Sequence, residues 1–190
     1  EFARRGWVAV GVMRRGYGSS EGEFSEGYGR CQNPDYLSAG RESANDIRAA
    51  VRVMREKPYV DSSKIISVGR SAGAYATVAL TAESLPGLIA AISFAGGRGS
   101  VREDFVCEEQ SLVEAFRTFG QTSRTPMLWV YSENDRYFHP RLAREMHKAF
   151  TAAGGRAELI IAPAFGSDGH KLFSKNGIPL LVPYVFDFLD

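Results

Sequence analysis

The sequence lacks any long hydrophobic run. Its longest nearly unbroken apolar stretches, residues 7–13 and 178–186, are far shorter than the ~20 residues that cross a bilayer, and the second contains two prolines. We therefore predict no membrane span. The chain also lacks an excess of charge, since 23 Lys and Arg balance 22 Asp and Glu without any block of like sign. This balance argues against a nucleic-acid or lipid-surface partner.

Cysteine is scarce as well. Cys31 and Cys107 are the only two, too few and too widely spaced for a disulfide-rich scaffold or a zinc site. They permit one bridge at most, and two separate reduced thiols fit the sequence equally well. If they are paired, the bridge ties together two long loops and favours an oxidising compartment.

The remaining composition is that of an ordinary folded domain. The 190 residues are 44% hydrophobic and 24% charged, so we expect a single domain over residues 1–190. Short runs rich in Val and Ile alternate with segments of helical periodicity, which is typical of an α/β fold with a mostly parallel sheet and helices on both faces. Five runs are apolar along most of their length, as buried strands should be: Trp7–Met13, Lys64–Val68, Leu88–Phe94, Pro126–Tyr131 and Ala157–Ile161.

The helical segments follow from the spacing of apolar residues. Ala44, Ile47, Val51 and Met54 form one stripe, which predicts a helix that ends before Pro58. Three further helices are predicted over Ala74–Ala82, Pro140–Ala153 and Pro183–Leu189.

Two segments resist assignment. Gly16–Gly40 is dense in Gly, Ser and Tyr and is predicted to be a long surface loop. Arg98–Arg124 mixes charges with Phe105, Phe116 and Phe119, which fits either a lid or pocket wall, or a helix that packs its aromatic side chains on the core.

The sharpest motif is Gly69-Arg70-Ser71-Ala72-Gly73, which lies between a predicted strand and a predicted helix. A serine in such a tight strand-to-helix turn takes a strained backbone conformation and projects its hydroxyl above the carboxyl edge of the sheet. The turn also brings the amide of Ala72, at the start of the helix, to a developing oxyanion. We interpret Ser71 as a nucleophile and Ala72 as an oxyanion donor.

A serine nucleophile needs a base, and the chain has only three histidines. His170 lies in a glycine-rich loop after the last predicted strand, at the sheet edge where Ser71 should emerge, so it is the preferred base. His139 is the reserve candidate at the start of a helix. His147 falls within that helix, and we interpret it as a solvated surface residue.

The imidazole in turn needs an acid to fix its tautomer. Asp135 follows the strand Pro126–Tyr131 after a short turn and is the preferred acid. Glu133 and Asp168 compete, although Asp168 can also serve to order its own loop. Ser71, Asp135 and His170 then appear in the order nucleophile, acid, base, each after a different strand.

No metal or cofactor is expected. Asp135 with His139, or Asp168 with His170, offers two metal ligands without a credible third. The glycine-rich segments 16–21 and 96–99 lack the helix start or the Lys-Ser pair that phosphate binding requires, so nucleotide binding is disfavoured.

These motifs together resemble an α/β-hydrolase of the dienelactone-hydrolase-like or prolyl-oligopeptidase-like branches. The matching pieces are the segment 69–73, residues 15–22 after the first predicted strand, residues 132–135, and Gly169-His170. The resemblance implies a serine hydrolase that cleaves an ester, thioester or lactone of a small substrate through an acyl-serine intermediate. It also implies an exported protein, since similar bacterial hydrolases are often secreted.

The chain departs from this family at its front. Family members usually have three strands before the one that resembles Trp7–Met13, and one of these lies beside the strand that carries the nucleophile. The resemblance therefore implies an N-terminally truncated domain with a gap in its sheet. The second oxyanion donor normally comes from the same region, which leaves Ala72 and, as a substitute donor, Tyr17.

Two other readings remain open. A non-catalytic relative could keep the pocket as a ligand-binding protein, although it would not need all three residues of the triad. An acyltransferase or a peptidase could use the same triad, but peptidases of this branch usually carry a propeller domain that 190 residues cannot hold.

Overall fold

The computed structural model describes residues 1–190 and is built around a four-stranded parallel sheet. The strands are β3 (Ile65–Arg70), β4 (Leu88–Phe94), β7 (Met127–Ser132) and β8 (Ala157–Ala162), in the spatial order β3-β4-β7-β8. Four of the five predicted strands are therefore confirmed. Because all four run parallel, their carboxyl ends meet at one edge of the sheet, where the predicted site residues follow them.

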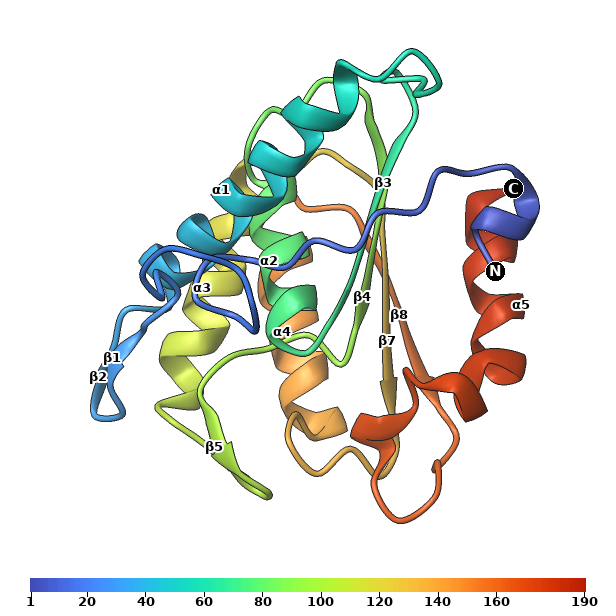
Figure 1. Cartoon of the computed structure of the whole chain (residues 1–190). Helices are drawn as coiled ribbons and strands as arrows, with labels where there is room; N and C mark the ends of the chain where they lie inside the picture. Colours follow the sequence, from blue (N-terminus) through green and yellow to red (C-terminus); the bar gives the residue numbers. More distant parts are fainter.

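Helices cover both faces of this sheet, as predicted (Figure 1). Helices α1 (Tyr36–Arg55), α2 (Ala72–Thr81), α3 (Glu109–Thr122) and α4 (Pro140–Ala152) lie on one face and share the larger apolar core. Helix α5 (Ile178–Leu189) lies on the other face over a smaller core. Three short 3-10 helices complete the helical structure: η1 (Ala3–Arg5), η2 (Gly169–Lys171) and η3 (Lys175–Gly177).

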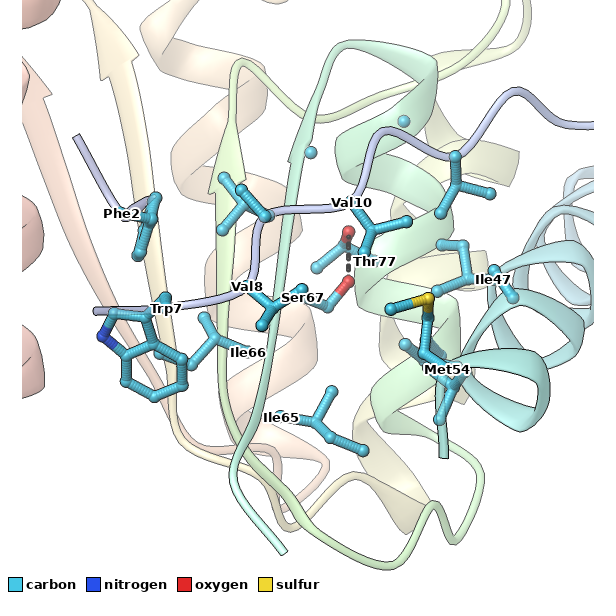
Figure 2. A pocket seen from close by; sticks show the side chains of 18 of the residues that line it. Phe2, Trp7, Val8, Val10, Ile47, Met54, Ile65, Ile66, Ser67 and Thr77 are labelled. Atoms are coloured by element: carbon cyan, nitrogen blue, oxygen red, sulfur yellow. Dashed lines mark hydrogen bonds between the residues drawn. The ribbon is translucent and has the colours of Figure 1, made fainter. Parts of the chain in front are cut away.

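The prediction of a strand over Trp7–Met13 is wrong. Residues 7–13 run in an extended path without any ladder hydrogen bonds, and Val8 and Val10 are each 48% exposed. A groove of about 860 Å³ separates this stretch from β3 and is also lined by α1 and α2 (Figure 2). A segment forms a strand only where a neighbouring strand pairs with it through backbone hydrogen bonds. The groove keeps β3 from pairing with residues 7–13, so this segment forms no strand. The groove lies where the family resemblance places a gap in the sheet.

Two predicted helix boundaries also shift. Helix α1 begins at Tyr36, inside the segment predicted to be a loop, because the side chain of Asp35 caps it by accepting from the Ser38 amide at 2.9 Å. Helix α5 begins at Ile178 rather than Pro183, so that Pro183 lies inside it. Pro179 lies in the first turn, where proline is tolerated, whereas Pro183 lies in the helix interior and removes one backbone hydrogen bond. The apolar face of α5 nevertheless packs on the sheet.

The unassigned segment after β4 folds into a hairpin and a helix. Strands β5 (Ser100–Arg102) and β6 (Phe105–Val106) form the hairpin, and α3 follows. Phe116 and Phe119 are buried in the main core, whereas Phe105 is 39% exposed. The helical part thus packs its aromatic side chains on the core, while a lid or pocket-wall role for the hairpin stays a prediction.

A disulfide joins the two long loops. Cys31 lies in the turn between the short strands β1 (Gly29–Arg30) and β2 (Asn33–Pro34), and it bonds to Cys107 at the start of α3. The sequence left open whether these cysteines are bridged or reduced, and in the structure they are bridged. Among the helices, none is long and apolar enough to cross a bilayer.

Candidate active site

Ser71 occupies the turn between β3 and α2 with a strained backbone. Its φ of 53° and ψ of −123° lie in a region that residues with a side chain rarely adopt. Gly69 permits this turn, because a Cβ there would lie 2.2 Å from the carbonyl oxygen of Gly73. Strand and helix can therefore pass closely only with glycine at position 69. The structure confirms the predicted turn from strand to helix around Ser71.

Asp135 and His170 form a buried pair at the same edge of the sheet. Nδ1 of the His170 ring lies 3.2 Å from both carboxylate oxygens of Asp135, which is fully buried. The carboxylate also accepts the backbone amides of Tyr137 at 2.8 Å and Phe138 at 2.9 Å. These bonds fix the carboxylate, place the ring proton on Nδ1 and leave Nε2 free to accept a proton.

The serine hydroxyl makes no hydrogen bond to this imidazole in the structure. The elbow and the histidine loop are instead joined through Arg70, whose Nε and Nη2 donate to the His170 carbonyl oxygen at 3.3 and 3.1 Å. Catalytic hydrogen bonds are often long without substrate and tighten when it binds. The structure thus places the His170 ring against Asp135. It also places the His170 backbone carbonyl against Arg70, the residue before Ser71.

The competing histidines have other partners. His139 precedes α4 and pairs with Asp104 at 3.2 Å on the surface. His147 is half-buried rather than solvated, because its Nε2 lies 2.9 Å from the Ala157 carbonyl oxygen and its ring packs on Trp129. The prediction for His147 as a plain surface residue is therefore wrong, although the residue stays apart from the Asp135 pair.

The competing acids also have other settings. Glu133 is exposed. Asp168 is buried, and its Oδ1 accepts the backbone amides of His170 at 3.0 Å and Arg136 at 3.3 Å. Asp168 therefore orders the loop that carries the imidazole.

The structure places Ala72, the predicted oxyanion donor, at the start of a helix. Ala72 is the first residue of α2, so its amide has no acceptor within the helix and faces the end where the helix dipole is positive. Tyr17 does not offer a second donor in this structure, because its hydroxyl donates to Glu26 at 3.0 Å.

Sequence reasoning missed a buried ionic cluster beside the site. Glu26 is fully buried and binds Arg14, Tyr17 and Arg98, with Arg98 Nη1 at 2.8 Å. Burial by itself raises the pKa of the Glu26 carboxyl, but the Arg14 and Arg98 guanidinium groups outweigh burial and hold that pKa below its ordinary value. Arg14 and Tyr17 line the groove together with Ser71. No pattern marks this glutamate, since its partners come from segments far apart in the sequence.

The groove connects the elbow with an apolar interior. It extends from Ser71 and Ala72 to side chains that Figure 2 shows around it, including Val8, Ile66 and Met54. Deep in the groove Ser67 and Thr77 share a hydrogen bond of 3.0 Å. The site therefore has an apolar cavity next to the serine.

A parallel sheet flanked by helices, with a serine elbow after β3, an acid after β7 and a histidine after β8, defines an α/β-hydrolase fold. A family model described as the dienelactone hydrolase family matches residues 19–176. The chain belongs to this family of hydrolases. No curated protein sequence matches the chain significantly.

Solved structures share the fold at low sequence identity. A protein of Klebsiella pneumoniae assigned as a dienelactone hydrolase aligns with a TM-score of 0.60 and 16% identity, over 82% of this chain and 63% of its own. Esterase PE8 aligns with a TM-score of 0.54 and 16% identity, over 80% of this chain and 63% of its own. Dipeptidyl peptidase 4 of Porphyromonas gingivalis aligns with a TM-score of 0.58 and 18% identity, over 79% of this chain and 22% of its own. The chain thus spans less than two thirds of the length of these structures.

Proposed function

We propose that the protein is a serine hydrolase that cleaves a carboxylic ester, thioester or lactone of a small substrate, with Ser71, His170 and Asp135 as its triad. The observation that carries the proposal is the buried imidazole–carboxylate pair at the sheet edge where the strained serine emerges. Membership of the dienelactone hydrolase family supports hydrolysis as the reaction. The disulfide supports an oxidising compartment and hence an exported protein.

The chemistry follows from the placement of the three groups. Ser71 Oγ attacks the substrate carbonyl carbon while Nε2 of His170 takes the hydroxyl proton, and the Asp135 carboxylate stabilises the imidazolium that results. The carbonyl oxygen becomes an oxyanion that the Ala72 amide contacts at the positive end of α2.

The intermediate then collapses to an acyl-serine. The imidazolium returns its proton to the leaving alkoxide or thiolate, which departs as an alcohol or thiol. Water enters next, gives a proton to Nε2 and attacks the acyl carbon, so that the carboxylic acid leaves and Ser71 regains its proton. The apolar groove beside Ser71 offers space for the acyl or alcohol part of the substrate.

The decisive experiment combines labelling and turnover. The protein should form a covalent adduct at Ser71 with a fluorophosphonate and hydrolyse a nitrophenyl ester, and Ser71→Ala should abolish both. Ser62→Ala is the matched control, because Ser62 is exposed and lies outside the candidate site. Labelling that persists in Ser71→Ala would contradict the assignment.

The alternative readings give different results in the same assay. A ligand-binding relative would bind small esters without forming a Ser71 adduct. A peptidase would cleave a peptide nitroanilide faster than the ester, and an acyltransferase would pass the acyl group to an added alcohol in preference to water.

A further inference from the structure

The base and the acid belong to one hydrogen-bonded unit at the ends of β7 and β8. Asn134, which precedes Asp135, accepts from the Phe165 amide at 2.9 Å through Oδ1 and donates to the Gly166 carbonyl oxygen at 3.1 Å. Its own carbonyl oxygen accepts from the Gly169 amide at 3.0 Å. The loop that carries the imidazole is therefore held to β7 at several points, and the imidazole keeps its place relative to its carboxylate.

The nucleophile belongs to a different unit. The Ser71 amide donates to the Phe94 carbonyl oxygen of β4 at 2.9 Å, and the Ser71 carbonyl oxygen accepts from Tyr75 of α2 at 3.0 Å. The elbow is thus fixed by β3, β4 and α2, none of which contributes the base. Catalysis needs these two units in register, because proton transfer requires the imidazole within hydrogen-bond reach of the hydroxyl.

The two units share one sheet through the β4–β7 ladder, and Phe94 of β4 stacks on Phe173 of the histidine loop at 4.6 Å between ring centroids. Between the elbow itself and that loop, however, one side chain makes all the direct hydrogen bonds. Arg70, the residue before the nucleophile, donates from Nε at 3.3 Å and from Nη2 at 3.1 Å to the carbonyl oxygen of His170. No other hydrogen bond connects residues 69–73 with residues 163–177. The acceptor belongs to the same residue that carries the imidazole, so the contact locates that residue directly relative to the elbow.

We propose that Arg70 is a positioning residue that ties the His170 loop to the elbow, so that the imidazole reaches Ser71 when substrate binds. This inference rests on the proposed function. A guanidinium with two donors converging on one oxygen restrains both distance and direction, which a single donor does not. A displacement of about 1 Å between reacting groups can lower a rate by about a hundredfold.

A purely structural contact would behave differently. Arg70 is exposed, and exposed charged contacts contribute little to the stability of a folded protein. Removing the side chain should therefore leave folding intact while separating nucleophile from base. Arg70 also lines the groove, but its guanidinium donates to the residue that carries the base, so the loss should appear mainly in kcat.

The test uses Arg70→Ala and Arg70→Lys in the full chain, with Arg144→Ala as the control. Arg144 is an exposed arginine of α4 that makes no hydrogen bond. We expect Arg70→Ala to lower both kcat for a nitrophenyl ester and the fluorophosphonate labelling rate by about ten- to a hundredfold, with KM and the melting temperature nearly unchanged. Arg70→Lys should retain part of the rate, and millimolar guanidinium, but not urea, should restore part of it to Arg70→Ala.

Hydrogen exchange gives a second readout that does not depend on turnover. In Arg70→Ala the amides of residues 164–177 should exchange faster, whereas the Nδ1 proton shared by His170 and Asp135 should keep its NMR resonance. A wild-type rate in Arg70→Ala, or unchanged exchange of that loop, would overturn the inference. A wild-type protein that fails to label at Ser71 would refute the proposed function instead, so the two failures are distinct.

Discussion

Removal of the Cys31–Cys107 bridge should destabilise the protein mainly through its unfolded state. The bridge closes a loop between residues 76 positions apart. In the chain-entropy treatment, a loop of this length removes about 15 cal/mol/K from the unfolded chain, or about 4.5 kcal/mol at 25 °C. Folded domains are typically stable by only about 5–15 kcal/mol. The bridge is therefore expected to supply a large share of the stability.

The folded state should change little without the bridge. The Cys107 amide donates to the Gly99 carbonyl oxygen at 3.0 Å, and the Tyr36 hydroxyl donates to the Cys107 carbonyl oxygen, so hydrogen bonds to the Cys107 backbone hold this segment without the bridge. Replacement of both cysteines by alanine should accordingly leave the folded structure near its present form while the unfolded chain gains freedom.

The measurement is urea unfolding followed by tryptophan fluorescence, in which the fully buried Trp129 reports the loss of the core. The double variant Cys31→Ala/Cys107→Ala should lose up to about 4.5 kcal/mol of unfolding free energy. Reductant should shift the wild-type curve onto that of the variant and leave the variant unmoved. Equal stability of the bridged protein and the variant would refute the reasoning.

Three further predictions concern the site and its surroundings. Asp135→Asn should lower kcat by about 10⁴-fold with little change in the urea midpoint, because it removes the charge that orients the imidazole. Gly69→Ala should destabilise the protein by about 1–3 kcal/mol or more by thermal unfolding, since its Cβ would overlap backbone, whereas Gly27→Ala, with no atom within 4 Å, should be neutral. Arg14 and Arg98 hold the pKa of Glu26 below 4.5 despite burial, so its contribution to stability is complete above pH 4.5 and is lost as pH falls through the lowered folded-state value. Urea midpoints measured between pH 6 and 2 should therefore fall at the acid end, and Glu26→Gln should reduce that dependence.

Local patterns predicted most of the sheet. The strands that became β3, β4, β7 and β8 are continuous apolar runs, and each finds a parallel neighbour in the fold. Trp7–Met13 has the same composition, but pairing depends on what lies beside a segment, which its own residues do not encode. The pattern of apolar residues therefore could not predict that this segment lies outside the sheet.

The candidate site divides in the same way. The turn around Ser71 could be predicted because a glycine-flanked serine between strand and helix is a local signal. The Asp135–His170 pair could be predicted because both residues follow parallel strands, whose ends converge. The Glu26 cluster and the Arg70 contact could not, since each joins residues whose proximity arises only from packing.

The backbone conformation of Ser71 also lowers the stability of the folded protein. A non-glycine residue at φ 53° raises the energy of the native state by about 1–3 kcal/mol, and only the surrounding strand and helix keep it there. Glycine would occupy that position without strain, so a chain selected solely for heat resistance would drift towards losing its hydroxyl. Under the proposed function, the serine in this turn is kept for its hydroxyl at a cost in stability.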